Sequence, residues 1–226
     1  MTSKLSVLGS AALALFALAG TARADVTIYT SLSDFLAAVS TTGTDTFTGF
    51  SISGTTASPV NRTAGSFSYT ATVLPTATGA TGTHTFFGGG TTANPFIATN
   101  IAGDTMSFSN FSAGVTAAGG NFFASNASGL FTALGGVIVT ATDASGVVKQ
   151  TIVPTNASAG SFLGFVSTTG VTSFTVASNI AGAGSSIWPS MDNLVLATSP
   201  VPEPSTYAML MVGLGLAGVV IRRRRN

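Results

Sequence analysis

Residues 137–153 read VIVTATDASGVVKQTIV, and this stretch decides the fold class. Two runs rich in Val, Ile and Thr flank the turn Asp143-Ala144-Ser145-Gly146. Two β-branched runs around a short turn that contains glycine are typical of a β-hairpin. Side chains two residues apart lie on the same face of a strand, so we expect Val137, Val139 and Ala141 to share the core face.

Other parts of the chain show a similar alternation of apolar and polar residues. Such segments occur at 67–73, 106–110, 162–166, 171–176 and 194–196. Many short strands between Gly, Thr and Asn turns predict an antiparallel sandwich. Strands do not alternate with helices along the sequence, so a parallel sheet is not expected. We therefore expect a mainly β ectodomain over residues 25–196, a single antiparallel β-sandwich with a jelly-roll-like arrangement.

One short helix is expected near the start of this ectodomain. Ser31 stands three residues before Asp34, which is the spacing of a capping box in the first turn of a helix. The apolar residues that follow at helical spacing are Leu32, Phe35, Leu36 and Val39. This stripe predicts an amphipathic helix that packs on the core.

The composition excludes several classes of function. Only 7% of the 226 residues are charged, and a formal net charge of +1 offers no basic surface for nucleic acid. The absence of cysteine excludes a disulfide framework, thiol catalysis and Cys-ligated zinc. Between residues 25 and 200, Arg62 and Lys149 stand against six aspartates, which gives this part a net charge of −4. Its solubility must come from Ser, Thr, Asn and Gly, a composition common on bacterial surfaces.

The first 24 residues predict a signal peptide. Lys4 opens a short basic region, and residues 5–19 are apolar apart from two serines. Ala22 and Ala24 then frame a small-x-small cleavage site. A basic start, an apolar run of this length and an Ala-x-Ala exit are typical of a secretory signal peptide. We expect cleavage after Ala24 and export of the rest of the chain.

The C-terminus has three parts in a definite order. Pro202-Glu203-Pro204 lies in a linker, residues 197–206, and an uncharged apolar run follows at 207–221. The final segment, 222–226, consists of Arg222, Arg223, Arg224, Arg225 and Asn226. The apolar run predicts a transmembrane helix that is just short of a full span. Consecutive arginines stay on the cytoplasmic side of a membrane, so the ectodomain is expected outside it.

This tripartite end resembles the PEP-CTERM sorting signal, in which a Pro-Glu-Pro motif, one membrane helix and an arginine cluster follow one another. The resemblance covers residues 201–226. It implies that an exosortase, a membrane-embedded enzyme of Gram-negative bacteria, recognises Pro202, Glu203 and Pro204 as a substrate motif. It also implies a protein anchored in the inner membrane before processing, and then placed at the cell surface or in an extracellular polysaccharide (biofilm) matrix. The alternative is a plain C-terminal anchor with a proline hinge.

The sequence contains few residues or motifs that indicate a catalytic site. His84 is the single histidine, and no Gly-x-Ser-x-Gly elbow accompanies it. Gly88-Gly89-Gly90 lies in residues 76–95, a stretch that reads as a Thr/Gly-rich loop, and it lacks the lysine of a phosphate-binding loop. Six scattered aspartates do not indicate the paired carboxylates of a glycosidase. We expect no enzymatic activity and no catalytic residues.

Two weaker patterns concern ligands. Asp192 and Asn193 begin the last strand and offer oxygen atoms to calcium, the one metal that the sequence leaves open, with an Asx-type turn as the alternative. Trp188, in a loop at 178–190, is the aromatic residue best placed to stack on a sugar.

Two function classes remain open from the sequence. The first is a structural or interaction protein of the cell surface, associated with extracellular polysaccharide. The second is a carbohydrate-binding, lectin-like module with a specific glycan ligand. A flat surface of hydroxyl groups would favour the first class, and a concave sheet face with exposed aromatic rings would favour the second.

Overall fold

The computed structural model describes residues 26–76, 81–146, 148–153, 157–158, 160–180, 186–199, 210–211, 213–215 and 222. The predicted signal peptide at 1–24 and the Pro202-Glu203-Pro204 motif lie outside these ranges, as does most of the predicted membrane span at 207–221. In the described part of that span, residues 210–211 and 213–215 are helical. No helix among the described residues is both long and apolar enough to cross a membrane.

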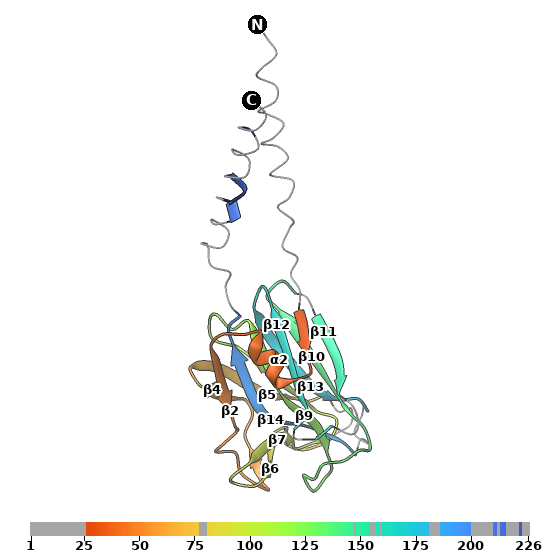
Figure 1. Ribbon diagram of the computed structural model, residues 1–226. Helices are drawn as coiled ribbons and strands as arrows, with labels where there is room; N and C mark the ends of the chain where they lie inside the picture. Colours follow the sequence, from red (N-terminus) through yellow and green to blue (C-terminus); the bar gives the residue numbers. More distant parts are fainter. Residues whose placement is uncertain are drawn as a thin grey trace.

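The ectodomain consists of two antiparallel sheets that enclose a common core (Figure 1). The strands of the eight-stranded sheet, in pairing order, are β1 (Val26–Tyr29), β12 (Phe162–Ser167), β9 (Ala117–Ser125), β14 (Trp188–Ala197), β7 (Pro95–Thr99), β6 (Phe86–Gly90) and β3 (Thr55–Thr56), with β2 (Thr42–Asp45) paired to β14. The strands of the six-stranded sheet are β11 (Val148–Val153), β10 (Val137–Asp143), β13 (Val171–Ser178), β8 (Thr105–Ser109), β5 (Phe67–Leu74) and β4 (Val60–Ala64). The predicted antiparallel sandwich is confirmed, and its jelly-roll character stays a prediction.

The predicted hairpin is formed by β10 and β11. Val137 lies opposite Val153 and Thr142 opposite Val148, which places the turn between residues 142 and 148 as expected. Val139 is fully buried in the core, together with Val137 and Ala141. The face assignment made from the alternation is therefore confirmed.

The short helix α2 (Leu32–Ala37) is also present. The Asp34 backbone N–H donates to the Ser31 hydroxyl at 3.4 Å, so Ser31 caps the helix as predicted. Phe35 is fully buried against Gly164 of β12, where a Cβ would overlap its ring. The predicted apolar stripe is wrong in one respect, because Leu32 and Leu36 are each 43% exposed. The helix lies on the sheet by the side that carries Phe35, and these two leucines, four residues apart, share a side turned toward solvent.

Aromatic rings from both sheets meet in the core. The Phe108 ring of β8 stacks on the Phe174 ring of β13 at 4.5 Å between centroids, and Phe122 of β9 meets Phe174 edge-on at 6.1 Å. Aromatic pairs of this kind add to the free energy gained from burial alone. These rings join the two sheets into one core.

Two stretches predicted as loops contain strands. Residues 76–95 include β6, so Gly88, Gly89 and Gly90 are strand residues, and β14 begins at Trp188 inside the predicted loop 178–190. Packing explains why a glycine is found in this strand, because a Cβ on Gly89 would overlap the ring of Phe96 on the neighbouring strand. A strand of this kind lacks the β-branched alternation by which strands are predicted.

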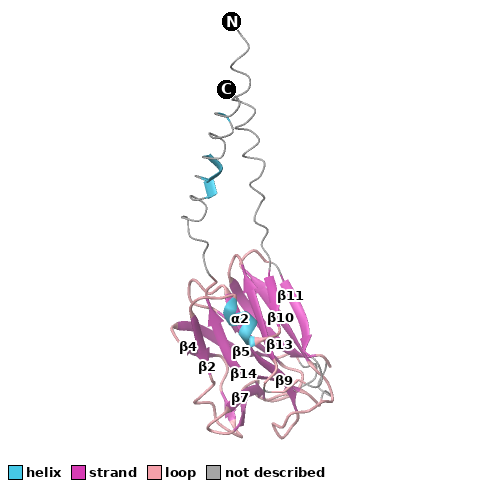
Figure 2. Ribbon diagram, in the orientation of Figure 1, coloured by secondary structure: helices cyan, strands magenta, loops and turns pink. Residues whose placement is uncertain are grey.

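The two ends of the ectodomain lie close together. The start of β1 and the end of β14 are found at one end of the sandwich, whereas β6 and β7 lie toward the other end (Figures 1 and 2). The C-terminal linker therefore leaves the sandwich from the end opposite to β6 and β7.

Candidate functional site

Each sheet has one face in the core and one face turned outward, and the two outward faces differ in chemistry. On the six-stranded sheet, the outward residues of neighbouring strands pair in rows. One row consists of Thr72, Ser107, Thr175, Thr140 and Gln150, and the next of Asn61, Thr70, Ser109, Ser173 and Thr142. Neighbouring strands lie about 4.8 Å apart, so these side chains form a regular, uncharged array. We call these ten residues the hydroxyl face.

The outward face of the eight-stranded sheet is more varied. On β9, Phe122 points into the core, so its neighbours Asn121 and Phe123 point outward. Asp192 of β14 pairs with Asn121 and points the same way. Phe35 of helix α2 and Val39, just after the helix, cover the part of this face nearest the end of β14. The part toward β6 and β7 has no helix over it among the described residues.

This second part holds a cavity of about 490 Å³. Its aromatic lining consists of Phe87, Phe96, Phe123 and Phe131, and we call it the phenylalanine cavity. The Phe96 and Phe123 rings meet edge-to-face at 5.0 Å and are buried. Phe131, in contrast, is 45% exposed at the rim. The sequence did not reveal this site, because β6 lies in a stretch predicted as a loop and neither β7 nor β9 was predicted as a strand.

Trp188, the residue predicted to stack on a sugar, lies beside this cavity. Its indole N–H donates to the Asn100 backbone carbonyl at 3.3 Å, and the side chain is half-buried. It lines a small hollow of about 100 Å³ that shares Phe87 with the phenylalanine cavity. Its role as a sugar-binding residue stays a prediction.

Asp192 and Asn193, the residues proposed for calcium, lie at a β-bulge in β14. Asn193 has a left-handed backbone, with φ of 56°, and the pairing register shifts there. Asp192 is buried, and its Oδ1 atom has no hydrogen-bond partner, whereas Asn94 bonds to the same carboxyl group. Calcium requires six or more oxygen ligands, and no group of three acidic or histidine residues is found among the described residues. Asp192 alone does not make such a site, and calcium stays a prediction.

The Asp192 carboxyl predicts a measurable pH effect. Burial raises its pKa above the ordinary 3.8, although hydrogen bonds from Asn193 and Asn94 lower it in part. The folded state therefore holds this proton more tightly than the unfolded chain, so the contribution is favourable at low pH and is lost as the pH rises through the folded pKa. We expect Asp192→Asn to raise the melting temperature at pH 7, with a gain that shrinks as the pH falls toward about 4.

The matched control is Asp34→Asn, because Asp34 is exposed in the first turn of α2. It should give no gain at pH 7. A melting temperature of Asp192→Asn equal to that of the parent at pH 7 would show that the buried carboxylate costs no stability.

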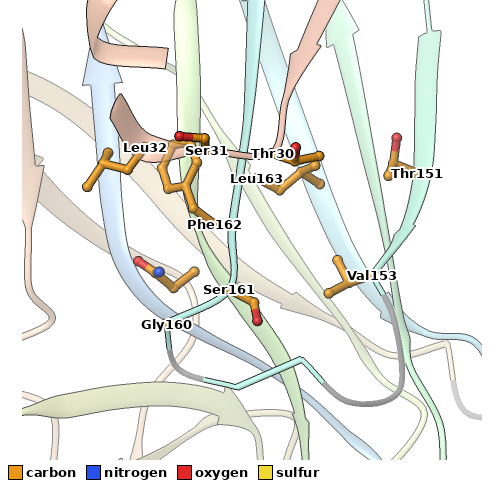
Figure 3. Close-up of a pocket in the computed structure, with 10 residues that line it drawn as sticks. Thr30, Ser31, Leu32, Thr151, Val153, Gly160, Ser161, Phe162 and Leu163 are labelled. Carbon is orange, nitrogen blue, oxygen red and sulfur yellow. The ribbon is translucent and has the colours of Figure 1, made fainter. Parts of the chain in front are cut away.

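A further cavity, of about 570 Å³, lies between the start of α2, the edge strand β11 and strand β12, which is paired on both sides. Figure 3 shows Thr30, Ser31 and Leu32 on one side and Ser161 and Val153 on the other. Its lining contains no ionisable side chain. Hydroxyl groups and apolar side chains without a titratable group offer binding contacts but no acid–base chemistry.

His84 has a partner that the sequence did not reveal. Its Nδ1 atom lies 2.6 Å from Oδ2 of Asp104, which is fully buried, while His84 remains partly exposed. Hydrolase triads also contain a buried acid hydrogen-bonded to one ring nitrogen of a histidine. They further need a nucleophilic hydroxyl hydrogen-bonded to the other ring nitrogen. No such hydroxyl bonds to His84 among the described residues. The two residues stand twenty positions apart, and no motif links them.

A second buried polar cluster consists of Asp45, Arg62 and Tyr69. Arg62 donates two hydrogen bonds of 2.7 Å to the Asp45 carboxylate, and the Tyr69 hydroxyl donates a third of 2.7 Å. Burial raises the pKa of Tyr69 far above its ordinary value, and the Asp45 charge raises it further. Asp45 belongs to the eight-stranded sheet and the other two residues to the six-stranded sheet, so the cluster ties the sheets together.

Comparison with known proteins identifies the C-terminal segment. Residues 200–225 match the PEP-CTERM protein-sorting motif, which confirms the resemblance seen in the sequence. No curated protein matches the chain. A solved structure of a glycoside hydrolase family 43 arabinoxylan arabinofuranohydrolase from Bacillus subtilis, in complex with cellotetraose, is 20% identical over 57% of this chain and 24% of its own, with a TM-score of 0.29. A likeness of that degree carries no argument about function.

Proposed function

We propose that this chain is a bacterial surface protein that an exosortase processes at Pro202-Glu203-Pro204 and that then associates with extracellular polysaccharide. The observation that carries the proposal is the PEP-CTERM motif over residues 200–225. A sorting signal of this kind implies an exported protein with an exosortase as its processing partner. The signal peptide expected at 1–24 supplies the export step.

The chemistry of the C-terminal segment supports this order of events. Arg222–Arg225 hold the end of the apolar run 207–221 on the cytoplasmic side, since several adjacent charges do not cross a hydrocarbon core. Pro202 and Pro204 then lie at the outer boundary of the membrane. Proline lacks an N–H donor and disfavours a helical neighbour, so the sequence predicts an extended segment that an enzyme can reach.

The hydroxyl face supports association with a hydrated polysaccharide. Its two rows carry Ser, Thr, Asn and Gln side chains and no charge. Hydroxyl groups both donate and accept hydrogen bonds, so they can exchange partners with water and with sugar hydroxyls. A neutral surface of this kind does not repel an acidic polymer, and its binding to a polymer should not depend on the salt concentration.

Changing Glu203 to Ala tests the processing step. Glu203 carries the single charge of the motif and takes no part in export, so the variant should still be exported and inserted. We expect it to keep residues 207–226 and to remain in the inner membrane, whereas the parent protein loses them. Mass spectrometry of C-terminal peptides, in a host that carries an exosortase, measures the difference.

Thr206→Ala is the matched control, because it changes a neighbouring residue outside the Pro-Glu-Pro motif, and it should be processed like the parent. The proposal fails if the parent protein retains residues 207–226. It also fails if the Glu203 variant loses them as readily as the parent does. Either result would leave a plain anchor with a proline hinge.

A second candidate function is that of a carbohydrate-binding module. The observation that favours it is the phenylalanine cavity, which lies on the opposite side of the sandwich from the hydroxyl face. Concave sites lined by aromatic rings with a few polar groups are the usual form of small-ligand pockets. Affinity electrophoresis of the mature protein through gels that contain polysaccharide measures such binding as a loss of mobility.

A further inference from the structure

We infer that the phenylalanine cavity binds a neutral saccharide, with the Phe131 ring as its stacking platform. This inference rests on the proposed function as a carbohydrate-binding module, and it specifies the site and the chemical class of the ligand. The cavity volume of about 490 Å³ is large enough for a sugar unit.

None of the described residues that line the cavity has an ionisable side chain. Its polar lining groups are the hydroxyls of Ser53, Thr91 and Ser128 and backbone groups of glycines. A charged ligand would lose its hydration there without gaining an opposite charge, which is unfavourable. A neutral ligand with hydroxyl groups can form hydrogen bonds with these residues and lose no charge solvation.

The rings are arranged as a floor and a rim. Phe96 and Phe123 form a buried floor and contact each other edge-to-face. Phe131 is 45% exposed and lines the cavity, so a ligand can reach its side chain. A sugar ring has apolar C–H faces and polar edges, and an aromatic ring beside hydroxyl groups complements both.

Glycines shape the cavity where the backbone approaches the rings. A Cβ on Gly89 would overlap Phe96. Gly129 has a φ of 70°, a conformation that other residues rarely adopt, and it lies against Phe87. Side chains larger than glycine at positions 89 and 129 would therefore crowd the rings that line the cavity.

The loop that carries Phe131 is held in place by its own hydrogen bonds. The Asn126 side-chain oxygen accepts from the backbone N–H groups of Ser128 and Leu130 at 2.9 and 3.0 Å. Phe131 itself forms an isolated β-bridge with Ser125. A loop backbone held in this way loses little conformational entropy when a ligand binds.

The position of the cavity suits a protein tethered by its C-terminus. It is built on β6, β7 and the loop after β9, and β6 and β7 lie toward the end of the sandwich opposite to the end of β14 (Figure 1). A ligand in the surrounding matrix can therefore reach it while the C-terminal helix is still in the membrane.

The experiment compares Phe131→Ala with Leu134→Ala in the mature protein purified from its host. Leu134 lies on the same loop and is 71% exposed, but it does not line the cavity. Affinity electrophoresis with amylose, galactomannan and mixed-linkage glucan provides neutral probes, and alginate provides an acidic one. We expect Phe131→Ala to bind at least one neutral polymer about tenfold more weakly than the parent, as the loss of an aromatic contact predicts.

Phe131→Tyr keeps the ring and should bind like the parent, as should Leu134→Ala. The inference is overturned if Phe131→Ala binds as tightly as the parent, if both alanine variants weaken equally, or if alginate alone is bound. The processing of Glu203 variants is measured separately. Normal processing of a protein that binds none of the polymers would leave the sorting function intact and overturn the saccharide site.

Discussion

Replacing Arg62 with Met should lower the free energy of unfolding by about 3–5 kcal/mol, because it leaves the buried Asp45 carboxylate without its partner. The Arg62 and Asp45 side chains are only 18% and 4% exposed, so water cannot replace the lost hydrogen bonds. Arg62 also donates to the Thr48 carbonyl at 3.1 Å and lies 4.8 Å from the centre of the Phe50 ring. One substitution therefore removes an ion pair, a cation–π contact and a link between the sheets.

Urea denaturation of the mature protein measures this effect, with Thr63→Ala as the control. Thr63 is exposed on the same strand, β4, and its change should cost about 0.5 kcal/mol or less. The double variant Asp45→Asn with Arg62→Met removes the unpaired charge as well as its partner. It should be less destabilised than the sum of the two single variants, because the two residues are directly coupled. Additive losses would show that the ion pair contributes nothing of its own.

Replacing Val139 with Asp should cost about 3 kcal/mol or more, because it places a carboxylate without a partner in the core. Val139 is fully buried in β10 and lies between Thr151 of β11 and Val176 of β13. The Val139 side chain faces the core between the two sheets, so a residue at this position cannot turn toward water. We expect a large fall in the urea midpoint, or failure to fold.

Thr140→Asp is the matched control for this change. Thr140 is the next residue of β10, but it lies on the hydroxyl face. The same charge there remains in contact with water and should cost about 1 kcal/mol or less. Equal losses for the two variants would mean that the strand tolerates no aspartate at all, and that the two faces do not differ as the structure indicates.

The hairpin β10–β11 and the N-cap of α2 could be predicted because both depend on neighbours in the sequence. The turn residues 143–146 bring two adjacent runs together, and Ser31 caps a helix that begins at the next residue. The same holds for the PEP-CTERM motif at 200–225, because a sorting signal is read as a linear stretch of sequence. The signal peptide expected at 1–24 depends on the same kind of local pattern and stays a prediction.

Strands that pair distant parts of the chain were harder to predict. In β9, Gly119 and Gly120 interrupt the apolar pattern, because the Phe162 and Met191 side chains occupy the space that their Cβ atoms would fill. The role of a glycine in a strand depends on which ring or side chain lies across from it. That partner is 40 to 70 residues away and is known only once the sheet has formed.

The order of neighbouring residues in the sequence thus predicted the export and sorting signals, the sandwich class and the core face of the hairpin. The pairing of distant strands created the hydroxyl face, the phenylalanine cavity and the Asp45–Arg62–Tyr69 cluster. The residues of each of these come from at least three separate strands or loops. Their position depends on sheet register, and a shift of one residue would turn every such side chain to the opposite face. Long-range packing selects that register, since it buries the apolar face of each strand in the common core.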